Sequence, residues 1–356
     1  IKNHTADPSV ELKQDLECIY SLLSYKYLNL HDFSGSLAAI QNAVDILQSI
    51  PEASRSVETS RRLATVYRDK ANIQSKERDL AGSLESNRLC IDILTQCVKE
   101  GNQWSDIQES SNNYLNRTRY FGLMGDFEEV IQTVSEMEDF ISQYQHMDTR
   151  GELNYNRASG MVFHGMALSQ SGDLEGSLAK YQAAEEIYQA KVRDTPLWRE
   201  EVSYLYTNKG VVLERMGRLD EALECSETAI GYFKDIVYRH GKFEELNNLV
   251  TMYLNQGAIL DRLGHLDRAR DVYSQAIQIR EHMVLKEGRT DLTIELAGAY
   301  INVSVNQSLS GQFQEALVNV SRAHALFRKS FEATGEPIVK FYLALTLQNR
   351  ARYLVQ

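Results

Sequence analysis

Small and large side chains recur along this chain with a regular spacing. A polar residue followed by Leu or Phe returns at intervals of 47, 47, 47, 45, 47 and 47 residues, in Asp32-Phe33, Asp79-Leu80, Asp126-Phe127, Asp173-Leu174, Arg218-Leu219, His265-Leu266 and Gln312-Phe313. Eight residues before each pair stands a small residue, which forms the column Ser24, Ala71, Thr118, Gly165, Gly210, Gly257, Ser304 and, one period later, Ala351. These columns predict an internal repeat.

Further columns keep the same register and indicate helices. An aromatic or large apolar residue precedes most small residues by four positions, and Ser, Ala or Val follows them by twelve. A third column lies seven positions further on: Ala43, Cys90, Met137, Ala184, Ala229, Ala276 and Ala323. These offsets are near multiples of 3.6, so each column marks one face of a helix.

Glycine and proline divide each repeat into two helices. Gly125, Gly172, Gly217, Gly264 and Gly311 stand where a first helix should end in a left-handed cap. The four prolines fall near the expected starts of first helices. The sequence predicts first helices at 9–30, 55–77, 104–124, 150–171, 196–216, 243–263, 289–310 and 337–356, and second helices at 32–50, 79–100, 126–146, 173–193, 218–240, 265–287 and 312–333.

The predicted fold class is therefore all-α, an α-solenoid of antiparallel helix hairpins with about seven and a half repeats. We expect a single array over residues 1–356, with repeats at 9–50, 55–100, 104–146, 150–193, 196–240, 243–287 and 289–333 and a partial repeat at 337–356. The missing initial Met and the partial repeat lead us to expect a fragment of a larger protein.

Two copies resemble the tetratricopeptide repeat residue by residue. The first has Tyr206 and Gly210, then Met216-Gly217-Arg218-Leu219-Asp220-Glu221-Ala222 and Ala229, and the second has the matching residues from Tyr253 to Ala276. The period of 47 exceeds the usual 34 residues. In this it is similar to the lengthened repeats of kinesin light chains and of sensor arrays in bacterial signalling ATPases. The resemblance implies a right-handed superhelix whose first helices line a concave groove that binds a peptide, tail or partner helix.

A column of asparagines is the candidate binding feature. Two residues before the small column stand Leu22, Asp69, Asn116, Phe163, Asn208, Asn255, Asn302 and Asn349. Asn is a poor helix former, so local propensity does not explain its recurrence. The resemblance places this position in the groove, where an amide can read the backbone of a bound peptide. The alternative is that these side chains bridge adjacent hairpins.

Two charged features accompany this column. Arg215 and Arg262 share a column in consecutive repeats and could take an acidic group, or they could pair with neighbouring carboxylates. Residues 103–148 hold nine acidic residues against Arg117 and Arg119. This excess predicts either a solvated helix face or a dock for a basic segment of a partner.

Composition and motif searches narrow the class of protein. A net charge of -11 argues against nucleic-acid binding, and no apolar run approaches the roughly 18 residues of a membrane span. Phosphate loops, zinc-ligand spacings and nucleophile motifs are absent, so we expect no cofactor, no metal and no enzyme activity. The four cysteines lie in no CxxC pair, which favours a reducing, cytoplasmic location.

The sequence thus predicts a scaffold or sensor array that binds a peptide, tail or protein partner in a concave groove. One alternative is the regulatory region of a multidomain signalling protein, which recognises a large folded partner and controls an ATPase or protease effector elsewhere. Another is a structural spacer or self-assembly module. The sequence therefore predicts protein or peptide partners, and the self-assembly alternative adds self-association to them.

Overall fold

The computed structural model describes residues 8–190 and 196–356, and all regular structure within these ranges is helical. The α-helices are α1 Pro8–Asn29, α2 Phe33–Gln48, α3 Val57–Lys76, α4 Leu80–Gly101, α5 Trp104–Met124, α6 Phe127–Tyr144, α7 Leu153–Ser171, α8 Leu174–Gln189, α9 Pro196–Arg215, α10 Leu219–Lys234, α11 Leu246–Arg262, α12 Leu266–Glu281, α13 Thr293–Leu309, α14 Phe313–Thr334 and α15 Pro337–Val355. The all-α helical repeat is confirmed. Residues 191–193 of the predicted helix 173–193 lie outside the described ranges.

Helices α10 and α12 each continue into one π-helical turn, at Asp235–Arg239 and His282–Lys286. The turns between first and second helices follow the glycine pattern. Gly125, Gly172, Gly217, Gly264 and Gly311 all have positive φ, as a left-handed helix cap requires. In the first two hairpins the same place is taken by His31 and Arg78, with φ of 58° and 65°.

The columns of small residues form the interface within each hairpin. Residues twelve and nineteen positions after the small column are at most 1% exposed in all seven hairpins: Ser36, Ser83, Val130, Ser177, Ala222, Ala269 and Ala316, then Ala43, Cys90, Met137, Ala184, Ala229, Ala276 and Ala323. Short side chains at these contacts let the two helix axes approach closely. The recurring columns are therefore explained by packing.

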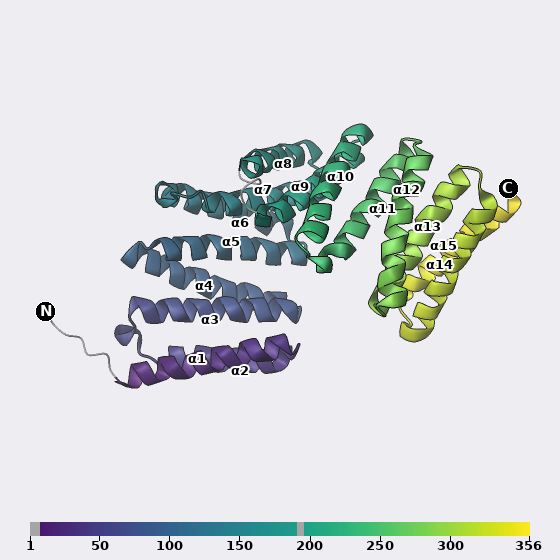
Figure 1. The fold of residues 1–356 in the computed structure, drawn as a ribbon. Coiled ribbons are helices and arrows are strands. Elements are labelled where there is room, and N and C mark those ends of the chain that lie inside the picture. Colours follow the sequence, from purple (N-terminus) through teal and green to yellow (C-terminus); the bar gives the residue numbers. More distant parts are fainter. Residues whose placement is uncertain (1–7, 191–195) are drawn as a thin grey trace. The chain divides into compact units, whose positions relative to one another are not determined.

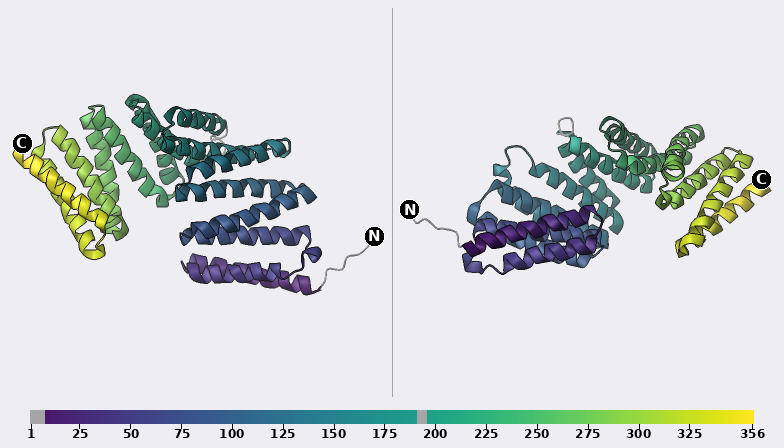
Figure 2. Two further views of the ribbon diagram at one scale, coloured as in Figure 1. Left: turned by 180° about the vertical axis from the view of Figure 1, so that it is seen from behind. Right: turned by 60° about the horizontal axis from the view of Figure 1, so that its bottom comes forward.

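The chain divides into two compact units, Ile1–Tyr188 and Gln189–Gln356. In the first unit, each helix from α1 to α6 packs on the next one along the chain, and in the second unit each helix from α9 to α14 does the same. Figure 1 shows neighbouring helices of each unit side by side, and Figure 2 shows the same stacking from two further directions. A single continuous array stays a prediction.

Polar pairs link the first helices of neighbouring hairpins. Arg61 donates from Nε and Nη2 to the two carboxylate oxygens of Asp106 at 2.8 and 2.9 Å. The amide of Asn248 donates to the Tyr204 hydroxyl at 3.0 Å. Such bidentate and charge-assisted contacts are geometrically selective, so they fix the register between repeats.

Candidate functional site

Two grooves occupy the same place in two different pairs of hairpins. The first, which we call the Phe163 groove, is a cavity of about 150 Å³ between α5, α6 and α7, lined by Arg119, Gly122, Leu123, Phe127, Val130, Phe163, Met166 and Ala167. The second, the Asn255 groove, is a cavity of about 110 Å³ between α9, α10 and α11, lined by Tyr206, Thr207, Gly210, Val211, Glu214, Ala222, Ser226, Met252, Asn255 and Ile259. Each volume suits one side chain better than a whole small-molecule ligand.

The repeat register explains why the two grooves coincide. Arg119 and Val211 each follow the small residue of their own helix by one position. Phe163 and Asn255 each precede the small residue of the next first helix by two positions. The column that contains the asparagines therefore lines a cavity in both places, through Phe163 and Asn255.

Asn255 carries the polar chemistry of its groove. Asn255 lies within α11, away from the ends of the helix, and its side chain is exposed to solvent. It makes no hydrogen bond to any residue that the structure describes. On the opposite side of the groove, Glu214 of α9 forms an ion pair with Arg262 of α11. A bound group would therefore meet the Asn255 amide, which can both donate and accept hydrogen bonds. The Glu214 carboxylate beside it is already paired with Arg262.

The other members of the column differ in exposure. Asn116, Asn208 and Asn302 are half-buried, and Asn349 is 8% exposed. Within the described part of the chain, none of these four amides hydrogen-bonds another residue. Asp69 pairs with its neighbour Arg68 at 2.8 Å.

Bridges between hairpins come from other asparagines. Asn306, four residues after Asn302 on α13, is fully buried and donates to Asp261 at 2.6 Å and to the Leu266 carbonyl at 3.0 Å. Asn156 of α7 donates to Asn112 of α5 at 2.8 Å. Bridging and groove-facing amides thus occupy different columns.

The two arginines of the candidate site have different surroundings. Arg262 is paired with Glu214, the arrangement that the sequence analysis offered as the alternative to ligand binding. Arg215 is exposed at the end of α9. Asp261, beside Arg262, accepts from Asn306 and from the Tyr273 hydroxyl. Burial raises the pKa of Asp261, and these two hydrogen bonds act in the opposite direction.

The Phe163 groove is apolar and its chemistry is different. Leu123 and Met166 remain 62% and 37% exposed beside Phe163. Arg119 is the charged residue of the lining, and it has no ion-pair partner among the described residues. The neighbouring His164 is half-buried, and burial together with nearby Lys180 lowers its pKa to about 4. The repeat columns do not single out Leu123 or Met166, although apolar residues near an exposed helix end are a usable signal.

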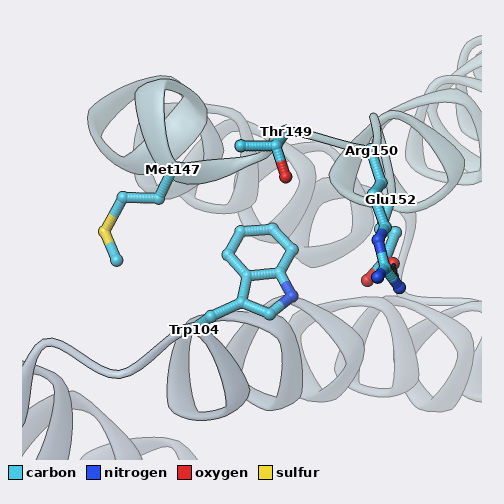
Figure 3. A pocket seen from close by; sticks show the side chains of 5 residues that line it. All are labelled: Trp104, Met147, Thr149, Arg150 and Glu152. Carbon is cyan, nitrogen blue, oxygen red and sulfur yellow. Dashed lines mark ion pairs between the residues drawn. The ribbon is translucent and has the colours of Figure 1, made fainter.

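A third cavity of about 280 Å³ lies at the turns between repeats, away from the asparagine column. Trp104, the first residue of α5, faces Met147 and Thr149 across it, and its indole nitrogen lies on the side of Arg150 and Glu152 (Figure 3). Arg150 and Glu152 form a loose ion pair at 3.8 Å. In the described ranges the indole N–H has no acceptor, so this cavity offers an aromatic wall and a donor. No sequence motif points to it.

Much of the acidic charge of residues 103–148 is matched within the first unit. Asp106 pairs with Arg61, Glu109 with Arg68, Glu136 with Arg117 and Glu138 with Arg157, at 2.7 to 3.1 Å. Asp126 accepts the backbone N–H of Glu129, and Asp148 accepts those of Glu152 and Leu153. The segment therefore offers a basic partner much less free charge than its composition indicates.

Metal and thiol chemistry gain no support from the described residues. They include no group of three or more His, Cys, Asp or Glu that could hold a metal ion. Cys97 is 1% exposed, and burial raises its pKa to about 11, which disfavours the reactive thiolate. Among the described helices, none is both long and apolar enough to cross a membrane.

Comparisons with known proteins agree with the repeat pattern. Residues 203–235 and 250–282 match the tetratricopeptide repeat model, whereas no curated protein matches the chain. The fold is similar to that of BtubC (BKLC) from P. vanneervenii, with a TM-score of 0.57, 16% identity and coverage of 71% of this chain and 92% of that one. It is also similar to aspartyl phosphate phosphatase F from Bacillus subtilis, with a TM-score of 0.57, 11% identity and coverage of 88% and 71%. Apo RapI has a TM-score of 0.50 and 11% identity, with coverage of 82% and 98%.

Proposed function

We propose that this chain, whose residues 203–235 and 250–282 match the tetratricopeptide repeat model, is a non-catalytic scaffold that binds an extended segment of a protein partner along its first helices. Tetratricopeptide repeats generally bind proteins or peptides. The observation that carries the proposal is the exposed Asn255, which lines a groove with its amide unpaired by any described residue. Its functional role follows from chemistry, since an amide can donate to a peptide carbonyl and accept from a peptide N–H.

The second unit would hold the main chain of the partner. Asn208, Asn255 and Asn302 occupy the same repeat position on α9, α11 and α13. Although each lies within a helix, its side-chain amide makes no hydrogen bond to another described residue. Asn349 on α15 would contribute less, because it is 8% exposed. Arg262 would act by holding Glu214 in place.

The first unit would hold an apolar side chain. Phe163 replaces the amide in the equivalent groove, with Leu123 and Met166 beside it. The proposal does not require one partner segment to cross both grooves, because each unit can bind a separate stretch of a partner. Asp69 and Asn116 share the column in this unit.

A peptide library selected on the chain, followed by affinity measurements, tests this proposal. The triple variant Asn208→Ala, Asn255→Ala, Asn302→Ala should lose at least about tenfold in affinity for selected peptides, since each lost peptide hydrogen bond is worth roughly 1 kcal/mol. Asn42→Ala, an exposed asparagine on the second helix α2, is the control and should bind like the parent. Equal affinity for the triple variant and the parent would contradict the role of the column.

A further inference from the structure

The cavity of about 280 Å³ beside Trp104 is larger than either groove and lies away from the asparagine column. Its volume is just below the roughly 300–1,000 Å³ of pockets for drug-sized ligands, so it has room for a smaller molecule. Figure 3 shows the indole of Trp104 on one side, Met147 and Thr149 facing it, and Arg150 and Glu152 at its polar edge.

The turn between α6 and α7 holds this polar edge in place. Gly151 has a φ of 70°, a left-handed conformation that suits glycine. Asp148 accepts the backbone N–H groups of Glu152 and Leu153, each at 2.8 Å. The amide of Gln108 on α5 donates to the Glu152 carboxylate at 2.7 Å. Because Glu152 is positioned in advance, a ligand that uses it loses less entropy on binding.

The packing of the hairpins does not explain why an indole lies at this place. The positions equivalent to Trp104 in the neighbouring first helices are Val57 and Gly151, so the column has no preference for an aromatic side chain. Trp104 is half-buried and packs on the core cluster that contains Ile107. Its N–H has no acceptor among the residues that the structure describes, so it can donate to a ligand.

The two charges at the edge of the cavity are opposite and loosely paired. Arg150 and Glu152 approach to 3.8 Å, and their side chains are 83% and 32% exposed. A ligand with only a carboxylate would draw Arg150 away and leave Glu152 without this counter-ion. A ligand with only an ammonium would compete with Arg150 for Glu152. A zwitterion supplies a partner for both charges, so the edge favours a ligand with one charge of each sign.

We propose that this cavity binds a free α-amino acid with an apolar or aromatic side chain. The ligand's carboxylate would accept from the Trp104 N–H and from Arg150, and its ammonium would donate to Glu152. Its side chain would pack on the indole face and on the thioether of Met147. The site is independent of the proposed peptide grooves, because no residue that lines either groove lines this cavity.

Titration of the full chain with L-phenylalanine, followed by NMR of the indole N–H groups, tests the proposal. The chain has two tryptophans, and the spectrum of Trp104→Phe identifies which indole signal belongs to Trp104. That signal should shift and saturate with a dissociation constant on the order of millimolar, since the ligand is small. The signal of Trp198, which is 7% exposed and belongs to the second unit, should stay in place.

Two analogues of phenylalanine separate the contributions of its charges. Phenylpropanoate lacks the ammonium group, and phenethylamine lacks the carboxylate. Each should bind at least about tenfold more weakly than phenylalanine, because one charge of the Arg150–Glu152 pair then has no partner on the ligand. An analogue that binds as tightly as phenylalanine would overturn the proposal.

Isosteric and exposed substitutions assign these contributions to residues. Glu152→Gln should weaken phenylalanine about tenfold and leave phenylpropanoate unchanged, so that the two ligands bind alike. Arg150→Gln should weaken phenylalanine, whereas Arg88→Gln, which removes an exposed arginine paired with Glu85 on α4, should bind like the parent. A Trp104 signal that does not move at about 20 mM phenylalanine would overturn the proposal. So would parent-like binding of phenylalanine by Glu152→Gln.

Discussion

The Phe163 groove and the Asn255 groove are formed by the same repeat positions but offer opposite chemistry. In the first unit the position two residues before the small column holds Phe163, and in the second it holds Asn255. The backbone geometry that opens a groove at this place is common to both. The difference therefore shows that the fold sets where a groove lies, while single column residues set the polarity of its lining.

The residues behind the grooves differ in the same way. In each unit a glycine of the small column lies against a tyrosine of the second helix, Gly165 with Tyr181 and Gly257 with Tyr273. Tyr273 donates to Asp261, which also accepts from Asn306. The place of Asp261 is taken in the first unit by Ser169, which is 6% exposed. The second unit thus supports its polar groove with a half-buried carboxylate.

Glycine substitutions should give the largest stability effects. A Cβ at Gly257 or Gly165 would overlap the tyrosine ring, so Gly257→Ala and Gly165→Ala should each cost about 1–3 kcal/mol of unfolding free energy. Gly210 is the matched control, because its added Cβ would lie 3.5 Å from the nearest atoms. Gly210→Ala should stabilise by up to about 1 kcal/mol through helix propensity. Urea unfolding checks all three, and equal costs would contradict the packing argument.

Two asparagines on one helix separate binding from stability. Asn306→Ala should cost about 1–2 kcal/mol, because it leaves a buried hydrogen-bonding network incomplete. Asn302→Ala should be neutral or stabilising by up to about 0.7 kcal/mol, since Asn302 has no described hydrogen-bond partner and Ala is the better helix former. Thermal melting of the two variants checks the contrast. A large loss of stability for Asn302→Ala would show that the column is structural.

Side-chain caps at the starts of the second helices differ between the two units, and each cap should contribute about 1 kcal/mol to the free energy of unfolding. Asp32, Asp79, Asp126 and Asp173 each accept a backbone N–H at the start of a second helix. His265 and Gln312, at the same place in the second unit, make no side-chain cap bond. Asp126→Ala should therefore lower the unfolding free energy by about 1 kcal/mol and His265→Asp should raise it by a similar amount. Denaturant midpoints provide the measurement, and no gain for His265→Asp would argue against it.

A pH dependence of stability is expected from His164 in the first unit. The folded-state pKa of His164 is about 4, against an ordinary value of 6.5. The unfolded chain therefore binds a proton first as the pH falls, so stability decreases between about pH 6.5 and 4. His164→Gln should reduce the difference between melting temperatures at pH 7 and pH 5. An unchanged difference would show that other groups determine it.

The helices and their packing columns were accessible from sequence because their causes are local and repeated. Gly125 and Gly172 mark left-handed turns through their own backbone freedom, and Ala229 and Ala276 recur because each hairpin needs the same close contact. Seven copies of one pattern make such signals readable. The family match at residues 203–235 and 250–282 falls on the two copies that fit the repeat best.

The details of the site were less accessible because they depend on residues far apart in the chain. Asp106 and Arg61 are 45 residues apart, and their pairing removes charge that composition alone assigns to an open acidic face. Arg262 and Glu214 are 48 residues apart. The cavity beside Trp104 arises where two turns meet. Periodicity identified the column to which Phe163 and Asn255 belong, but the hydrogen-bonding state of its amides required the structure.

The role of Asn255 can be tested most directly by exchanging the residues that distinguish the grooves. Peptides selected on the parent would be titrated against Asn255→Phe and Phe163→Asn and sorted by the unit that binds them. The account predicts that peptides bound by the second unit lose at least about tenfold in affinity with Asn255→Phe and keep it with Phe163→Asn. The reverse should hold for peptides bound by the first unit. Unchanged affinities in both variants would contradict the claim that this column determines what the grooves bind.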